Sequence, residues 1–252
     1  MRYPVAFQIY SSRLFPPIEA HLPKLKAMGY DAIEPWPPAY IDDPAAFRAR
    51  LDENELGCIG FHMPLSGLVD EPDRFIDIAL TLGARYLIPP FVPEAERRDT
   101  RAFWQGIGRQ LAAGAKAVGR HGLKVAWHNH AFEYVPLSDG SRPIDHILEA
   151  AGPAVGFEID CGWITRAGVD PAGELRRYAD RIVAIQVKDM APPGTGVEDG
   201  WAATGDGIIA WAGMVDLFRA TAADHIVTEH DNPADWEQFA DRSLRHVRGL
   251  GL

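Results

Sequence analysis

Metal-binding and acidic side chains stand at the end of one short apolar segment after another in this sequence. Four late segments show the pattern best: KVAWHNHAFE, VGFEID, IVAIQVKD and HIVTEHD. In a protein of alternating strands and helices, the carboxyl ends of parallel strands meet at one rim. We therefore expect a shared rim, suited to a sugar-sized substrate and a divalent cation, formed by His128, Asp160, Gln186 or Lys188, and Glu229.

The side chains at this rim have the composition of a cation site. Alternate residues of a strand face the same side, so Glu158 shares a face with Asp160, and Gln186 with Lys188. A carboxylate in an apolar barrel layer needs a partner, because desolvation of an unpaired ion is costly. Imidazole nitrogen, amide oxygen and two carboxylates suit Mn²⁺, Mg²⁺, Co²⁺ or Zn²⁺. We predict one such ion, held by His128, Asp160, Gln186 and Glu229.

The elements that must position these residues follow from the apolar pattern. Short runs rich in β-branched and aromatic residues alternate with longer segments whose apolar residues recur every three or four positions. The runs predict strands at residues 5–11, 32–36, 58–63, 86–92, 124–130, 154–160, 182–188 and 225–229. Prolines after acidic or amide residues predict helix starts at positions 44, 72, 171 and 233.

This order of elements indicates an α/β protein built as a single (β/α)8 TIM barrel over residues 1–252. Such barrels typically have about 250 residues and carry their active site at the carboxyl ends of the strands. The alternative is a doubly wound sheet, which needs a glycine-rich phosphate turn after the first strand, where this chain has QIYSSRLFPP. The irregular segment 191–207 is expected to cover the substrate, and Asp189 to brace it.

Composition limits the partners and the location. The net charge is −10 and no basic run occurs, so nucleic acid is not an expected partner. Cys58 and Cys161 lie far apart in apolar segments, which predicts buried reduced thiols and a cytoplasmic protein. The start of the chain shows no cleavage site, and no apolar run is long enough for a membrane span, so neither secretion nor a membrane partner is expected.

Several motifs connect the sequence to a known family. They are HNHAFE at 128–133, FEIDCGWITRAGVDP at 157–171, QVKDM at 186–190, GDG at 205–207 and TEHD at 228–231. Over nearly its full length the chain resembles the xylose-isomerase-like TIM-barrel superfamily of sugar and sugar-phosphate isomerases and epimerases. In that superfamily a Glu, an Asp, a His and a second Glu commonly hold one divalent metal. Asp160 and Glu229 match two of these ligands, whereas His128 replaces the first Glu and Gln186 the His.

The resemblance implies roles for the other rim residues. In the resembling enzymes two glutamates act as acid and base on opposite faces of the substrate. Here Glu229 remains as the catalytic carboxylate, and His128 is either the second base or a ligand. Lys188 is expected to neutralise an enediolate oxygen or bind a phosphate, or else to form a salt bridge. The residues expected to contact the substrate are His62, Glu133, His130, Trp163 and Glu34, with Glu133 also an alternative proton carrier.

Four functions fit these residues to different degrees. The first is a metal-dependent isomerase or epimerase of a carbohydrate, working by proton abstraction next to a carbonyl. The second is a lyase, a dehydratase of keto-inositol or 3-keto-sugar type, because the same enediolate can expel a β-hydroxyl. A catalytically silent sugar binder is the third, and an AP-endonuclease-like repair enzyme, which needs more rim histidines and a basic surface, is the fourth. Many proteins of the superfamily are dimers or tetramers, so a homo-oligomer is compatible with the sequence.

Overall fold

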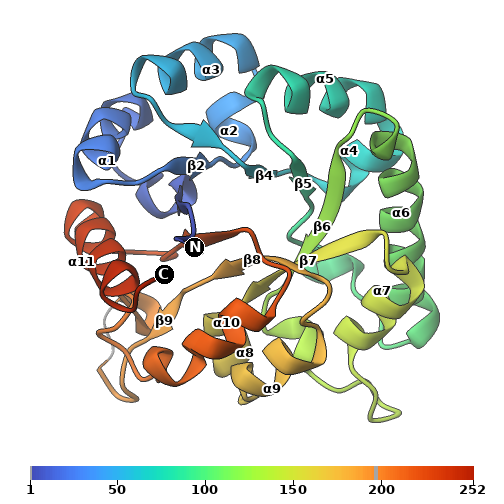
Figure 1. The fold of residues 1–252 in the computed structure, drawn as a ribbon. Helices are drawn as coiled ribbons and strands as arrows, with labels where there is room; N and C mark the ends of the chain where they lie inside the picture. Colours follow the sequence, from blue (N-terminus) through green and yellow to red (C-terminus); the bar gives the residue numbers. More distant parts are fainter. Residues whose placement is uncertain (1, 196–197) are drawn as a thin grey trace.

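A ring of parallel strands surrounded by helices forms this protein (Figure 1). The structure is a computed structural model and describes residues 2–195 and 198–252. The strands are β1 (Val5–Gln8), β2 (Ala32–Glu34), β3 (Gly57–Cys58), β4 (Gly60–His62), β5 (Tyr86–Ile88), β6 (Lys124–His128), β7 (Val155–Asp160), β8 (Ile182–Gln186) and β11 (His225–Thr228), with the hairpin β9 (Asp189–Met190) and β10 (Trp201–Ala202). The helices are α1 (Leu22–Met28), α2 (Pro37–Tyr40), α3 (Pro44–Glu53), α4 (Leu65–Asp70), α5 (Pro72–Leu82), α6 (Arg101–Gly119), α7 (Pro143–Ala151), α8 (Cys161–Arg166), α9 (Pro171–Arg177), α10 (Val215–Ala220) and α11 (Trp236–Gly249).

The sheet order confirms the predicted barrel. Hydrogen-bonded strands follow one another as β3-β2-β1-β11-β8-β7-β6-β5-β4. β3 and β4 are two parts of the predicted third strand, interrupted at Ile59, and they pair with β2 and β5 respectively. The two ends of the sheet therefore meet within one strand. The strand resumes at Gly60. A larger residue would collide with its neighbour there, because a Cβ would lie 2.7 Å from Ile88 Cδ1.

Local side-chain chemistry moves two of the predicted boundaries. The first strand, predicted at 5–11, ends at Gln8, whose side chain accepts a hydrogen bond from Tyr10 N while Ile9–Ser12 form a 3-10 helix. The last helix, predicted to start at position 233, begins at Trp236, because Asp235 caps it by accepting two backbone N–H bonds. The starts at positions 44, 72 and 171 are confirmed by α3, α5 and α9.

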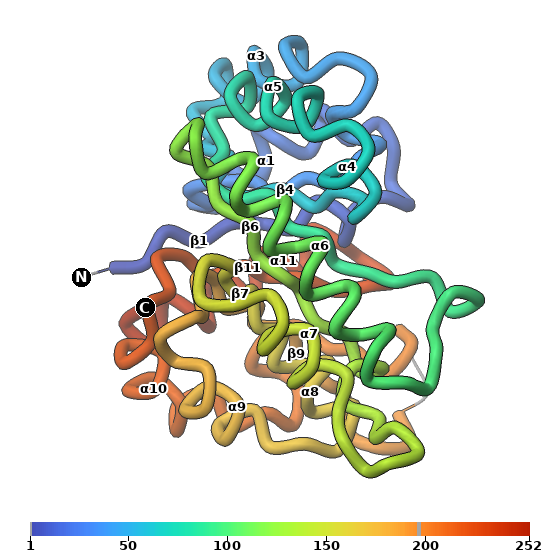
Figure 2. Tube along the Cα trace, turned by 90° about the vertical axis from the view of Figure 1, so that its right-hand side faces the viewer, coloured from blue at the N-terminus to red at the C-terminus, as the bar shows by residue number. Residues whose placement is uncertain are grey.

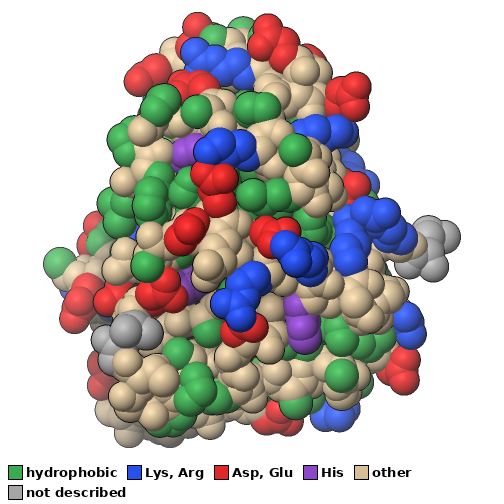
Figure 3. Space-filling view, turned by 90° about the vertical axis from the view of Figure 1, so that its left-hand side faces the viewer, with side chains coloured by type: hydrophobic (Ala, Val, Ile, Leu, Met, Phe, Trp, Pro, Cys, Tyr) green, Lys and Arg blue, Asp and Glu red, His purple; other side chains and the backbone are tan. Residues whose placement is uncertain are grey.

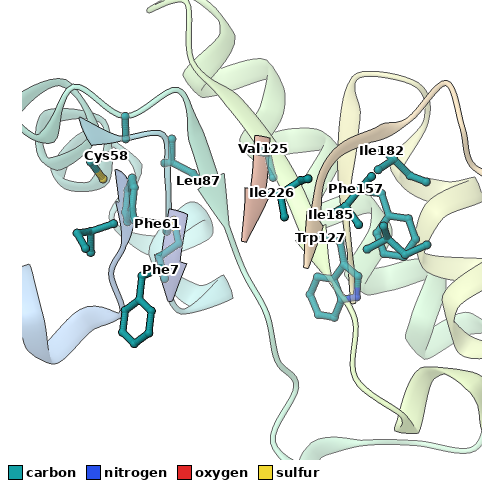
Figure 4. Close-up of a cluster of buried hydrophobic side chains, with 14 of the residues drawn as sticks. Phe7, Cys58, Phe61, Leu87, Val125, Trp127, Phe157, Ile182, Ile185 and Ile226 are labelled. Carbon is teal, nitrogen blue, oxygen red and sulfur yellow. The ribbon is translucent and has the colours of Figure 1, made fainter. Parts of the chain in front are cut away.

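Strand alternation separates an apolar outer layer from a polar barrel interior. Large apolar side chains of the strands join those of the helices in one buried cluster (Figure 4). Its strand members include Phe7, Phe61, Leu87, Trp127, Phe157 and Ile185. Many of their sequence neighbours are small or polar and are buried as well; they include Ala6, His62, Ala126, His128, Glu158 and Gln186. Apolar side chains such as Tyr86 and Ile88 also belong to this inner layer. Burial of apolar surface between sheet and helices thus stabilises the fold, and much of the interior holds polar side chains.

The segment after β8 is more regular than predicted. β9 and β10 pair as an antiparallel ribbon, and Trp201 of β10 is buried. Asp189 is fully buried and accepts hydrogen bonds from the backbone N–H groups of Gly205, Gly207 and Ile209. This confirms that Asp189 braces the segment. Residues 196–197 of the predicted cover lie outside the described residues.

Asp189→Ala is expected to lower the free energy of unfolding by about 2–4 kcal/mol, because several buried N–H donors lose their acceptor. One of them is Trp211 Nε1, which lies 2.7 Å from Asp189 Oδ2. Urea unfolding of this variant measures the loss. Asp206→Ala serves as the control, because Asp206 is partly exposed and its carboxylate pairs with Arg242 at the surface. Equal losses in the two variants would contradict the bracing role.

Both cysteines are free and buried, as predicted. Burial raises the pKa of the Cys58 thiol to about 12 and that of Cys161 well above its usual range. We expect both thiols to react with Ellman's reagent at pH 8 only as fast as the chain unfolds, because the thiolate is the reacting form. Unfolded protein serves as the control and should react at both positions at once. Rapid reaction of the native protein would contradict this burial.

The surface is mixed in charge. On the face shown in Figure 3, Lys and Arg side chains are interspersed with Asp and Glu. Among the described residues, no helix has the length and apolar character needed to cross a membrane.

Figure 2 shows the two chain ends on the same side of the barrel. The loops that follow the strands, including the one between β5 and α6, extend on the opposite side.

Candidate active site

Four adjacent barrel strands carry the predicted metal ligands to one rim. β6 ends at His128, β7 at Asp160 and β8 at Gln186, while Glu229 directly follows β11. These strands are neighbours in the order β6-β7-β8-β11, and Asp160 lies opposite Gln186 in the register of β7 and β8. His128, Asp160 and Glu229 each place one potential ligand atom within 4.8 Å of the others. Sheet order and register therefore bring together residues that are about a hundred positions apart in the chain.

Several buried polar atoms at this rim are left without a hydrogen-bond partner in the part of the chain that the structure describes. Asp160 uses Oδ1 to cap α8, accepting a hydrogen bond from Trp163 N at 2.8 Å, and its Oδ2 has no partner. Both side-chain polar atoms of Gln186 are also unpaired, although the residue is fully buried. Buried polar atoms are rarely left unpaired in folded proteins. The orphaned oxygens of Asp160 and Gln186, beside His128 and Glu229, fit a divalent cation.

Burial dominates the electrostatics of the rim. It raises the pKa of Asp160 well above its usual range and that of Glu229 to about 7, with Lys188 acting in the opposite direction in both cases. Burial, together with the neighbouring His62, lowers the pKa of His128 well below its usual value. The imidazole of His128 is thus held neutral, which is the form that binds a metal.

Lys188 forms a buried ion pair at the same rim. Its Nζ lies 2.5 Å from Asp231 Oδ1 and 3.6 Å from Glu229 Oε2. The ammonium group also lies 4.7 Å and 4.4 Å from the ring centres of Trp163 and Trp201. Burial alone would lower the pKa of Lys188, but the surrounding carboxylates raise it, so the side chain stays charged. The predicted salt bridge therefore exists, with Asp231 and Glu229 as its partners.

A cavity of about 960 Å³ opens beside these residues. Its polar end is lined by His62, His128, His130, Trp163, Glu229 and Asp231. His62, His130 and Trp163, which the sequence predicts as substrate contacts, thus line this cavity. The His130 ring lies 5.0 Å from that of Trp163, and burial lowers the pKa of His130 well below its usual value.

Two predicted substrate contacts lie outside the set of described residues that line this cavity. Glu133 is fully buried, and its carboxylate accepts hydrogen bonds from Trp127 Nε1 at 3.2 Å and His130 N at 2.9 Å. It therefore holds the turn after β6, and its position corrects the prediction that it carries protons or binds hydroxyls. Glu34 points into the barrel interior, where it accepts a hydrogen bond from Gln8 Nε2 at 2.9 Å, and this position corrects the prediction that it contacts the substrate.

His62 connects the cavity to the barrel interior. Its Nε2 lies 3.2 Å from Glu34 Oε1 and 3.1 Å from Glu158 Oε1. Burial lowers the pKa of His62, but the two carboxylates outweigh this effect and raise it to about 10. His128 Nδ1 approaches the same Glu158 oxygen at 3.0 Å. The cavity is therefore bordered by a protonated imidazole at His62 and a neutral one at His128.

Asp231 and Glu158 are site residues to which the sequence predictions gave no role of their own. Asp231 stands two positions after Glu229 in the TEHD motif, and Glu158 two positions before Asp160. The two-residue spacing was the available signal for both, because alternate residues share a face in an extended segment.

Comparisons with known proteins agree with this fold. A family model described as xylose isomerase-like TIM barrel matches residues 22–250. The inosose dehydratase of Geobacillus kaustophilus is 27% identical over 191 residues, covering 67% of this chain and 61% of that protein. The chain spans less than two thirds of the length of the curated relatives that it matches.

Solved structures show the same architecture. A sugar phosphate isomerase/epimerase from Parabacteroides distasonis superimposes with a TM-score of 0.80 at 15% identity, over 98% of this chain and 93% of that chain. The IOLI protein, crystallised with a zinc atom, gives a TM-score of 0.78 at 15% identity, over 99% and 98% of the two chains. At these identities the likeness shows the fold. Because the family model covers nearly the whole sequence, this chain belongs to the xylose isomerase-like TIM barrel family.

Proposed function

We propose that this chain is a divalent-metal-dependent isomerase or epimerase that removes a proton next to the carbonyl of a sugar, keto-sugar or sugar phosphate. The observation that carries the proposal is the convergence of His128, Asp160 and Glu229 beside one cavity. The ion would be held by these residues and Gln186. When bound, a divalent ion supplies a Lewis acid that polarises a carbonyl and makes the neighbouring C–H acidic.

Glu229 is the proposed base. It lines the cavity, and burial raises its pKa to about 7, which is near the optimum for a group that exchanges protons at neutral pH. A carboxylate has two oxygens, so one can face a cation while the other takes the proton. His128, held neutral and fully buried, is proposed as a ligand and not as the second base.

Lys188, His130 and Trp163 are proposed to position the reactants. Lys188 pairs with both Glu229 and Asp231; it keeps Glu229 in place and limits the rise of the Glu229 pKa. The Trp163 ring at the polar end of the cavity offers a surface on which the apolar face of a sugar can stack. His130 beside it offers a ring nitrogen to a substrate hydroxyl.

Dehydration is the second candidate, and His62 is the observation that favours it. His62 lines the same cavity as Glu229 and is protonated at neutral pH, because the carboxylates of Glu34 and Glu158 raise its pKa to about 10. A base and an acid facing one cavity can remove a proton and protonate a leaving hydroxyl group. The likeness to an inosose dehydratase supports the same reaction class. A role on DNA is not proposed, given the net charge of −10.

Incubation with a panel of ketoses, keto-inositols and sugar phosphates in D₂O with Mn²⁺ tests the proposal. Deuterium uptake with an unchanged formula indicates isomerisation or epimerisation, and uptake with loss of water indicates dehydration. Both should stop when a chelator removes the metal. A protein that neither exchanges deuterium with any member of the panel nor gains thermal stability from Mn²⁺ would instead be a silent binder.

A further inference from the structure

Three more polar side chains meet inside the barrel, apart from the four proposed ligands at the rim. Glu34 on β2, Glu158 on β7 and His225 on β11 each place one potential ligand atom within 4.8 Å of the others. In the sheet order, β1 separates β2 from β11, and β8 separates β11 from β7. Side chains from alternate strands form one interior layer of such a barrel. All three residues are at most 1% exposed.

Each of the three side chains has one atom in use and one atom unused. The Oε1 atoms of Glu34 and Glu158 contact His62 Nε2. The Oε2 atoms of both glutamates and Nε2 of His225 are buried and have no hydrogen-bond partner within the ranges 2–195 and 198–252. Three unpaired polar atoms in one interior layer are unusual for a folded protein.

The hydrogen bond of His225 Nδ1 determines whether its other nitrogen, Nε2, is a donor or an acceptor. Nδ1 of His225 lies 2.7 Å from Asp224 Oδ1, so it carries the proton and donates it to that carboxylate. Asp224 is held in turn by Tyr86 Oη at 2.8 Å and by Arg85 Nη2 at 3.2 Å. In the neutral ring, Nε2 then presents a lone pair. A carboxylate bonded to one ring nitrogen while the other is left as an acceptor is the arrangement found at metal-bound histidines.

A cation satisfies this cluster better than a water molecule does. Two carboxylate oxygens and an imidazole lone pair are all acceptors, whereas a water molecule has two protons to donate. Among the described residues, the two glutamates share one ring nitrogen, His62 Nε2, and both meet it through Oε1. A divalent ion would meet the two free Oε2 atoms and the His225 nitrogen at once.

We propose that Glu34, Glu158 and His225 form a second divalent-cation site inside the barrel, which we call the interior site. One nitrogen and two carboxylate oxygens suit Zn²⁺ or Mn²⁺. Because its ligands are buried, the ion is taken up as the chain folds and exchanges slowly afterwards. The ion stabilises the polar interior layer whose glutamates contact His62. The interior site shares no ligand with the rim, although Glu34 and Glu158 contact His62 and Glu158 also contacts His128.

Metal counting tests the interior site. Protein refolded with Zn²⁺ alone should hold about two ions per chain, and brief treatment with EDTA should leave about one, because the buried ion escapes slowly. The variant Asp160→Asn/Glu229→Gln, which removes rim ligands, should keep the EDTA-resistant ion. His225→Gln should lose it. His146→Gln is the matched control, because His146 is buried, bonds Ser141 through Nε2 and leaves its Nδ1 unpaired in the structure.

Wild-type protein that keeps no ion after EDTA, or His225→Gln that keeps as much as wild type, would overturn the interior site. If His225→Gln does not fold, zinc-edge anomalous diffraction from wild-type crystals decides. A peak among Glu34, Glu158 and His225 supports the site, and a water molecule there without anomalous signal rejects it. Full activity of Asp160→Asn/Glu229→Gln would count against the rim proposal alone, whereas loss of the resistant ion from wild-type protein would count against the interior site alone.

Discussion

Glu229→Gln is expected to lower kcat about 10²–10⁴-fold while the barrel stays folded, because the amide cannot take the substrate proton. Glu229 is the proposed base, and its carboxylate faces the cavity with a pKa that burial raises to about 7. The amide has nearly the same volume, so the packing changes little. Turnover of the substrate identified in the D₂O panel, measured with saturating metal, gives the effect on kcat.

Glu174→Gln is the matched control for this loss. Glu174 is also a buried carboxylate, but it lies on α9 and pairs with Arg142 outside the barrel interior. Its replacement should lower the free energy of unfolding and leave kcat near the wild-type value. If Glu229→Gln turned over substrate as fast as the wild type does, Glu229 would have no part in proton transfer.

Lys188→Met is expected to lower the free energy of unfolding by about 3 kcal/mol, because it leaves Asp231 and Glu229 without their buried cation. This is the low end of the range for a broken buried pair, since the Asp231 side chain is 23% exposed. Lys188 also lowers the pKa of Glu229. Its removal should raise that pKa further, so the acidic limb of the kcat/KM profile should move to higher pH.

Urea unfolding and a pH profile measure the two effects of Lys188→Met separately. Lys24→Met is the control, because the Lys24 ammonium pairs with Glu237 at an exposed site, where ion pairs contribute little. It should change the stability by less than about 1 kcal/mol and leave the pH profile in place. An unshifted acidic limb in Lys188→Met would contradict the coupling of Lys188 to Glu229.

The apolar periodicity of the sequence and the prolines at helix starts were sufficient to predict the barrel. Trp127 and His128 illustrate why: in a strand, adjacent residues face opposite sides, and the apolar one packs outside while the polar one faces inward. The same rule placed Asp160 on one face with Glu158, and Gln186 on one face with Lys188, and the register pairs Asp160 with Gln186. The strand predicted to end at residue 188 ends at Gln186. Strand alternation therefore predicted which side chains face inward.

Strand alternation did not predict the roles of Glu133 and Glu34. Glu133 lies in the turn after β6, where its carboxylate bonds back to Trp127 and the backbone of His130, and no periodicity predicts such a turn. Glu34 belongs to a strand and faces inward as expected. Glu34 lies in an interior layer with Glu158, whereas the cavity is at the rim. The depth of a side chain along the barrel axis depends on the stagger between strands, and the sequence pattern does not contain this stagger.

Anomalous diffraction from crystals soaked in Mn²⁺ tests the central claim most directly. The account predicts a strong peak within bonding distance of His128, Asp160, Gln186 and Glu229, beside the cavity, and its loss in crystals of Asp160→Asn. Full occupancy of Mn²⁺ elsewhere, with these four side chains bonded to one another or to water, would contradict a metal-assisted reaction at this rim.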